Sequence, residues 1–187
     1  MGIRVSYHRV SPEHLATLRS DVDALRDFVY ADNVQVPFVS IEKGHGGLHW
    51  LLDTYRRVTW RNHPRTARGR IVMGGAMVNR AFSEAHEDYP TRFLSNAEVN
   101  SAASDLAGIS RETLRAEFDW TAMTQHPDPN MQIYGAFLGE VYDHRKGSLV
   151  VYTESEHFER YWGHFAALRD FYRSAADSGD CVVALKD

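Results

Sequence analysis

The stretch Ser155–Leu185, SEHFERYWGHFAALRDFYRSAADSGDCVVAL, decides the fold, because it joins a long helix to a buried strand. Its first part, over about residues 155–176, repeats large apolar side chains at the spacing of one helix face; these are Phe158, Tyr161, Trp162, Phe165, Leu168 and Tyr172. Gly179 is typical of the residue that ends a helix. The nearly continuous apolar run Cys181–Leu185 then predicts a central strand with both faces buried.

Other strands are predicted along the rest of the chain. Alternating apolar and polar residues predict a strand over residues 3–9, and short apolar runs predict strands at 38–42 and 70–74. The 70–74 run ends in a glycine pair, which indicates a flexible turn. The run Ser148–Tyr152 is predicted to be a short strand or a buried connector.

Six helices are predicted, at about residues 12–19, 21–31, 43–55, 95–107, 110–118 and 155–176. Ser95 followed by Glu98 is the capping-box pattern of a helix start. Residues 76–90 are predicted to be irregular, residues 126–130 form a loop because they hold two prolines, and residues 131–142 are ambiguous. We therefore predict an α/β fold of the α+β type: one domain with a small mixed β-sheet covered by about six helices.

Length and composition are those of one soluble globular domain. A chain of 187 residues is long enough to bury a core of its own, and 43% apolar with 25% charged residues excludes a disordered chain. The longest uncharged stretches, such as Val34–Ile41, are too short to cross a bilayer, so no membrane segment is predicted. The N-terminal residues lack the apolar run of a secretory signal, and the one cysteine, Cys181, suits a reducing compartment. We therefore expect a cytoplasmic location.

The charge pattern disfavours nucleic acid as a partner. The formal net charge is −4, and basic residues are spread along the chain except in Arg56–Arg70, which holds six arginines and Trp60. Arginines beside an aromatic ring could bind phosphates and stack a base. Because the chain as a whole is acidic, we expect this segment to be a solvated loop.

The segment Lys43–Tyr55 concentrates the potential chemistry of the chain. It reads Lys-Gly-His-Gly-Gly-Leu-His-Trp-Leu-Leu-Asp-Thr-Tyr, and helical spacing places His45, His49 and Asp53 on one side of it. Polar groups meet an aromatic ring there, as they do in many ligand sites. The candidate ligand-binding residues are Lys43, His49, Trp50 and Asp53.

The sequence leaves open two interpretations of His45 and His49. His45 and His49 could chelate a metal ion over one helical turn, with Asp53 as a ligand or as the acceptor that orients His49. Against this, the pair lacks the intervening glutamate of the metalloprotease motif, and Gly46 and Gly47 weaken the helix at that turn. In the other reading His49 is a partly buried residue bonded to Asp53 or to a backbone carbonyl, and His45 flanks the helix start. We expect neither a bound metal nor another cofactor.

Three stretches carry a resemblance to a known family. The first is Ile41–Lys43 followed by Leu48–Leu52, and the second is Ile71–Gly75 with Tyr89–Val99. The third is Phe165–Tyr172, which leads into the final strand. In this order they resemble the YfbM-like family of bacterial proteins, a domain of unknown function, through its acidic-Lys stretch before Leu-His-aromatic, its glycine pair and its helix entry.

The resemblance spans almost the whole chain and implies one domain over residues 1–187, a small α/β protein of the cytoplasm. It carries no established activity or catalytic residues. His45 and Gly46 stand where the family tends to have a tryptophan followed by a polar residue, and residues 130–146 look like an altered or enlarged loop. A His45–His49 metal pair would therefore be peculiar to this protein, whereas His49 alone belongs to the family pattern.

The residues give no complete catalytic set, since no serine lies in a nucleophile-elbow pattern. We expect a soluble binding or protein-interaction module with a cleft around residues 43–55. The alternative is an enzyme of unknown reaction, with His49 as general base oriented by Asp53 and a metal at His45 as an aid. Whether the partner is a protein or a small molecule, and whether the chain forms a homo-oligomer, are left open by the sequence.

Overall fold

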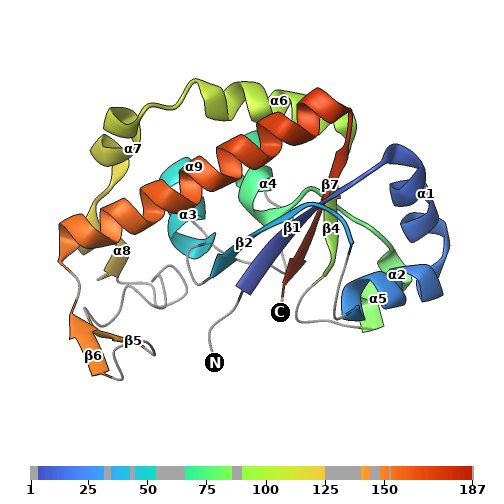
Figure 1. Ribbon diagram of the computed structural model, residues 1–187, viewed down its shortest axis with the longest axis horizontal. Helices are drawn as coiled ribbons and strands as arrows, with labels where there is room; N and C mark the ends of the chain where they lie inside the picture. Colours follow the sequence, from blue (N-terminus) through green and yellow to red (C-terminus); the bar gives the residue numbers. More distant parts are fainter. Residues whose placement is uncertain are drawn as a thin grey trace.

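The computed structural model describes residues 4–31, 35–42, 45–53, 66–85, 90–124, 140–143, 148–151 and 153–186. Within these residues a five-stranded sheet has the order β2-β1-β7-β4-β3, and β5 and β6 pair as a separate two-stranded sheet (Figure 1). The strands are β1 (Arg4–Val10), β2 (Phe38–Glu42), β3 (Ala76–Met77), β4 (Arg92–Leu94), β5 (Glu140–Asp143), β6 (Ser148–Val151) and β7 (Cys181–Lys186). The helices are α1 (Pro12–Ser20), α2 (Val22–Tyr30), α3 (His45–Leu52), α4 (Ala67–Met73), α5 (Arg80–Ala85), α6 (Asn96–Ala107), α7 (Arg111–Glu117), α8 (Trp120–Thr124) and α9 (Glu154–Ser178).

Most predicted elements are confirmed. The strands β1, β2 and β7 match the predictions at 3–9, 38–42 and 181–185, and β6 shows that residues 148–151 form a strand. The six predicted helices correspond to α1, α2, α3, α6, α7 and α9. The described part of the chain holds three more helices, α4, α5 and α8, of which α5 lies in the stretch predicted to be irregular. The predicted loop at 126–130 and most of the ambiguous stretch 131–142 lie outside the described residues; the end of the latter belongs to β5.

The sheet is antiparallel in every described pairing, which corrects the expected mixed sheet. β7 pairs with β1 on one side, where Ala184 lies opposite Tyr7, and with β4 on the other, where Val183 lies opposite Phe93. Strand direction depends on which strands become neighbours. Here α9 returns the chain to place β7 between strands that are distant in sequence, so local patterns carry no information about direction. The predicted α+β class, a single domain with a small sheet covered by helices, is confirmed.

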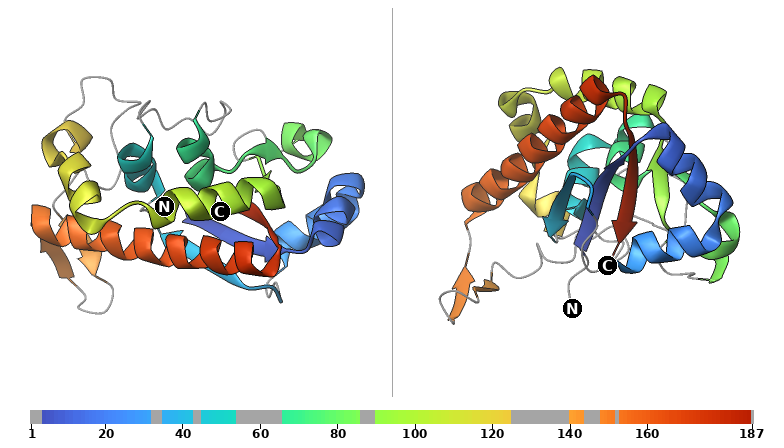
Figure 2. Two further views of the ribbon diagram at one scale, coloured as in Figure 1. Left: turned by 90° about the horizontal axis from the view of Figure 1, so that it is seen from above. Right: turned by 45° about the vertical axis from the view of Figure 1, so that its right-hand side comes forward.

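Helices cover the two faces of the sheet and give two apolar cores (Figure 2). The larger core joins α3, α4, α6 and α9 to one face, and the smaller core joins α1, α2 and α5 to the other. β7 alternates between them: Val182 and Ala184 belong to the larger core, while Cys181, Val183 and Leu185 belong to the smaller. The prediction of a central strand with both faces buried is therefore confirmed.

The segment predicted as a strand at 70–74 is instead the helix α4, followed by Gly74 at a φ of +75°. The carbonyls at and just beyond the end of this short helix are buried and accept hydrogen bonds from distant residues. Tyr172 donates to Ile71 at 2.8 Å, Tyr7 to Val72 at 2.7 Å, and Arg92 to Gly75 at 2.9 Å. These donors replace the backbone partners that a helix C-terminus lacks, so an apolar run flanked by glycines can be helical.

Capping residues fix the two long helices of the larger core. The capping box predicted from Ser95 and Glu98 is present, with the Ser95 backbone N–H donating to the Glu98 carboxylate at 2.9 Å. A second box begins α9, where the Thr153 backbone N–H donates to Glu156 at 2.7 Å. Gly179 ends α9, as the sequence predicted, and it has the left-handed conformation with φ +73°.

Among the described residues, no helix combines the length and the apolar character that crossing a bilayer requires.

Candidate functional site

The predicted site residues that the structure describes lie in α3 or directly after it, and their side chains are buried. His49 is 2% exposed, Trp50 3% and Asp53, directly after the helix, 3%. Lys43 lies outside the described residues, and so does the side chain of His45. The described part of the candidate site therefore consists of the C-terminal half of α3 and the elements that pack against it.

His49 and Asp53 meet, as their spacing predicted. Nε2 of His49 lies 3.4 Å from Oδ2 of Asp53, one helical turn along. The carboxylate lies against Gly69 in the first turn of α4, so close that a Cβ at Gly69 would collide with Oδ2. Thr66 caps that turn, because Gly69 donates its backbone N–H to Oγ1 of Thr66 at 2.9 Å. The pair thus joins the end of α3 to the beginning of α4.

Gly47 of α3 has a packing role that the sequence did not predict. A Cβ at Gly47 would collide with the aromatic ring of Tyr161, on α9. Gly47 therefore allows α3 to lie directly against α9, and the helix is held by this packing although glycine weakens it locally. Burial raises the pKa of Tyr161 to about 12, so its hydroxyl stays neutral at physiological pH.

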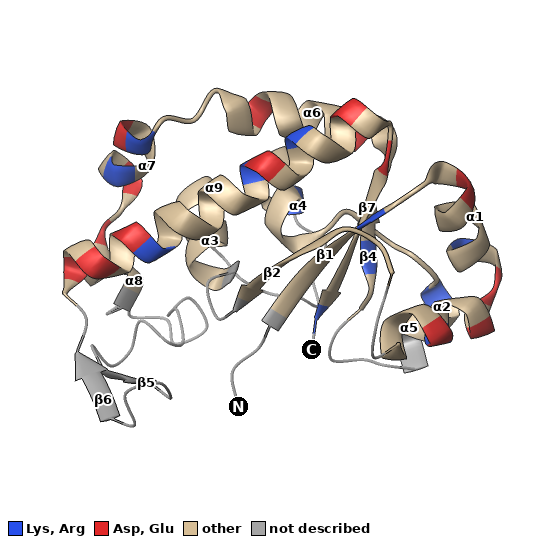
Figure 3. Ribbon diagram, viewed as in Figure 1, with Lys and Arg blue, Asp and Glu red and all other residues tan. Residues whose placement is uncertain are grey.

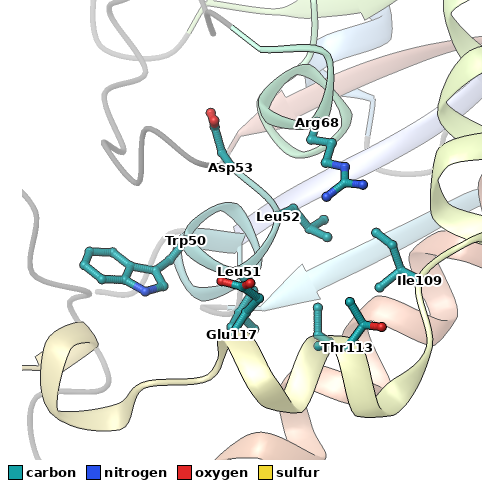
Figure 4. Close-up of a pocket in the computed structure, with 9 residues that line it drawn as sticks. Trp50, Leu51, Leu52, Asp53, Arg68, Ile109, Thr113 and Glu117 are labelled. Atoms are coloured by element: carbon teal, nitrogen blue, oxygen red, sulfur yellow. The ribbon is translucent and has the colours of Figure 1, made fainter.

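A pocket of about 320 Å³ lies between α3, α4 and α7 (Figure 4). Its lining residues come from three helices, from the residue directly after α3 and from the connection between α6 and α7; they are Trp50, Leu51, Leu52, Asp53, Arg68, Ile109, Thr113, Leu114 and Glu117. Leu51, Leu52, Ile109 and Leu114 are buried and give it apolar walls. Arg68, Thr113 and Glu117 are exposed, so the polar groups lie where the pocket opens to solvent.

Opposite charges lie on different walls of this pocket. Figure 4 shows the Arg68 guanidinium pointing from α4 toward Leu52 and Ile109, while the Glu117 carboxylate lies beside Leu51 on the α7 side. Within the described part of the chain Arg68 has no ion-pair or hydrogen-bond partner. The carboxylate of Asp53 points away from Arg68 and Leu52. The pocket can therefore offer the Arg68 guanidinium to a ligand with an apolar body.

The predicted residues divide between pocket and interior. Trp50 and Asp53 line the pocket, whereas His49 does not and lies among packed residues beside it. Sequence reasoning missed Arg68, Thr113 and Glu117. Two signals could have indicated them: Arg68 belongs to the basic stretch 56–70, and Thr113 and Glu117 stand one turn apart on a predicted helix.

The described residues add no further ligands to the hypothesis of a metal site at His45 and His49. Among the described residues, no three His, Cys, Asp or Glu side chains are grouped so that they could hold a metal ion. Since the His45 side chain lies outside them, the His45–His49 pair stays a prediction. The structure describes only Arg68 and Arg70 of the arginines in the basic stretch 56–70, and both lie on α4.

Comparison with known proteins identifies the family. The crystal structure of YfbM from Escherichia coli, a protein of unknown function, matches 98% of this chain with a TM-score of 0.68; the match covers 99% of YfbM at 16% sequence identity. At this identity the likeness shows a shared fold. Among curated protein sequences, none is significantly similar to this chain. The model of the family described as a domain of unknown function, DUF1877, matches residues 1–185, and this chain therefore belongs to that family, as its resemblance to YfbM-like proteins implied.

Proposed function

We propose that this protein is a binding module and that its ligand is a small molecule held in the pocket between α3, α4 and α7. The observation that carries the proposal is the lining itself: buried apolar walls with the Arg68 guanidinium directed between them. A volume of about 320 Å³ suits a compact molecule. The apolar walls would supply affinity by releasing water, and the guanidinium would orient the ligand.

The cellular location is part of the same proposal. Cys181 is buried, and burial raises the pKa of its thiol, which keeps it protonated and inert. A free, buried cysteine suits the reducing cytoplasm. The likeness to YfbM of Escherichia coli supports a bacterial origin.

One observation favours the alternative hypothesis of an enzyme: Nε2 of His49 lies close to the Asp53 carboxylate. A general base must reach the proton that it removes. His49 is 2% exposed and does not line the pocket, so a substrate there would contact Trp50, Leu51 and Leu52 before the imidazole. The geometry therefore supports binding better than catalysis, and the His49 base stays a prediction.

The proposal is tested by methyl NMR on protein labelled at leucine and isoleucine methyl groups, screened against small amphipathic compounds. Binding in the pocket would shift the methyl resonances of Leu51, Leu52, Ile109 and Leu114 together. Leu15 and Leu18 of the other core serve as internal controls, because they lie on the opposite face of the sheet. Shifts confined to Leu15 and Leu18, or no saturable shift at all, would overturn the proposed site.

A further inference from the structure

We infer that the ligand of this pocket is a compact monocarboxylate: a single carboxylate that pairs with Arg68, joined to an uncharged apolar body that packs between Leu52 and Ile109. The inference rests on the proposed function and adds the chemical class of the ligand. It follows from the surroundings of Arg68, from those of the other basic residues nearby, and from the acidic residues of the lining.

On α4, two arginines have different surroundings. Arg70 is paired within the fold: its Nη1 lies 3.3 Å from Oε1 of Glu98, on α6. Arg68 instead points into the pocket, toward Leu52 and Ile109 (Figure 4). Among the described residues Arg68 has no ion-pair or hydrogen-bond partner. One guanidinium of this helix is therefore used by the fold, and the other is directed toward the space that a ligand would fill.

On α7, the basic residues serve another contact (Figure 3). Arg115 pairs with Glu154 at 3.0 Å and Arg111 pairs with Glu159, so both tie α7 to α9. Both guanidinium groups also lie over the ring of Phe158. Neither arginine lines the pocket, so the basic group of the lining is the one that α4 supplies.

The position of Arg68 indicates how a ligand would lie. Arg68 is exposed, whereas Leu52 is 3% and Ile109 6% exposed. A guanidinium presents a fork of N–H donors that matches a carboxylate with two parallel hydrogen bonds. The carboxylate would therefore lie at the mouth of the pocket, and the apolar body would lie further in, against the two buried side chains. Such a ligand places no charge among the apolar residues, where a charge would be costly.

The acidic residues of the lining favour a ligand with one negative charge and no positive charge. The Asp53 carboxylate lies against Gly69 and points away from Arg68, and Glu117 takes part in an interaction of its own. A cation would have to displace that interaction and would be repelled by the guanidinium of Arg68. A dianion would be repelled by both carboxylates, while Arg68 neutralises only one of its charges.

The test compares four head groups on one phenylalkyl body. The probes are hydrocinnamate as the carboxylate, hydrocinnamamide as its neutral isostere, phenethyl phosphate as the dianion and hydrocinnamyl amine as the cation. Their dissociation constants are measured by titrating the Leu52 and Ile109 methyl resonances at about pH 8, where the phosphate carries two charges. The carboxylate is expected to bind about tenfold or more tightly than the amide, because the amide lacks the charge-assisted contact. It should also bind more tightly than the phosphate and the amine.

Variants assign this preference to Arg68. Arg68→Gln should bring hydrocinnamate down to the affinity of the amide and leave the amide unchanged. Arg68→Lys keeps the charge without the fork of donors and should give an intermediate affinity. Arg70→Gln is the matched control on the same helix outside the lining, and the preference should stay within about twofold of the wild type. Because Arg68 is exposed, its variants should fold; far-ultraviolet circular dichroism checks this.

The outcomes separate this inference from the proposed function. Equal affinity for the carboxylate and the amide, or tightest binding of the phosphate or the amine, would overturn the monocarboxylate while leaving a binding pocket. A preference for the carboxylate that persists in Arg68→Gln would overturn it as well, and so would the failure of all four probes where other amphipathic compounds bind. If neither those compounds nor the probes shift the pocket methyl groups, both proposals fall.

Discussion

The hydroxyl of Tyr7, on β1, donates a 2.7 Å hydrogen bond to the carbonyl of Val72, in the last turn of α4. Tyr172 makes the matching contact with Ile71 from α9. Burial raises the pKa of both tyrosines, so each keeps the proton that it donates. The helix that carries Arg68 is therefore held at its C-terminus by the sheet and by α9 together.

Tyr7→Phe should lower the free energy of unfolding by about 1–3 kcal/mol, because the buried Val72 carbonyl loses its donor. Tyr172→Phe should do the same through Ile71. Tyr161→Phe is the control: this tyrosine is also buried, but its hydroxyl has no hydrogen-bond partner within the described residues, so a change within about 0.5 kcal/mol is expected. Urea unfolding measures all three, and equal losses would refute the capping role.

Gly69→Ala and Gly163→Ala should have opposite effects. A methyl group at Gly69 collides with the Asp53 carboxylate, so the variant should lose about 1–3 kcal/mol of stability. A methyl group at Gly163, within α9, meets nothing within 4 Å, so the variant should gain about 0.5–1 kcal/mol from better helix propensity. Thermal unfolding distinguishes them. Stabilisation by both substitutions would show that Asp53 does not lie against α4.

His157→Phe should flatten the dependence of stability on pH below neutrality. Burial and the charge of Arg160 lower the pKa of His157 from its ordinary value of 6.5, although Glu156 opposes this, and its ring stacks on Trp120. The unfolded chain then binds the proton more readily than the folded chain does. Stability is therefore full above about pH 6.5 and falls as the pH drops toward the lowered pKa.

Urea unfolding of the wild type and of His157→Phe, between about pH 8 and pH 5, measures that difference. The wild type should lose more stability on acidification than the variant does. Parallel curves would mean that His157 titrates alike in the folded and unfolded chains.

His49→Gln separates the two readings of the buried pair. If the pair mainly joins α3 to α4, the variant should lose about 1–3 kcal/mol of stability, because the buried Asp53 carboxylate loses the imidazole that lies 3.4 Å from it. Pocket ligands should still bind within about twofold of the wild type, since His49 is not part of the lining. Unchanged stability with loss of turnover would instead support His49 as a general base.

The sequence could predict those elements of the fold that depend on local patterns of residues. The run Cys181–Leu185 alternates between two cores and is the central strand, and the Ser95–Glu98 capping box begins a helix where predicted. The helix α4 could not be predicted in this way. Its terminal carbonyls are bonded to residues as much as 101 positions away in the sequence, and a local pattern does not contain such partners.

The candidate site, too, could be predicted only where it depends on local spacing. Helical spacing predicted that His49 and Asp53 would meet, and they do. The pocket depends on Arg68 and Glu117, which come from helices that only the tertiary structure brings together. No local sequence pattern shows that His49 faces inward while Trp50, its neighbour, lines the pocket.

The central claim, that the pocket between α3, α4 and α7 holds a small ligand, is tested most directly by native mass spectrometry of protein purified gently from its own cells. Thr113→Trp should fill the pocket, because Thr113 is an exposed lining residue. Ala116→Trp places the same bulk on an exposed position of α7 outside the lining and is the control. A bound mass present in the wild type and in Ala116→Trp but absent from Thr113→Trp is the predicted result. A bound mass that persists in Thr113→Trp, or a wild-type protein without any, would contradict the claim.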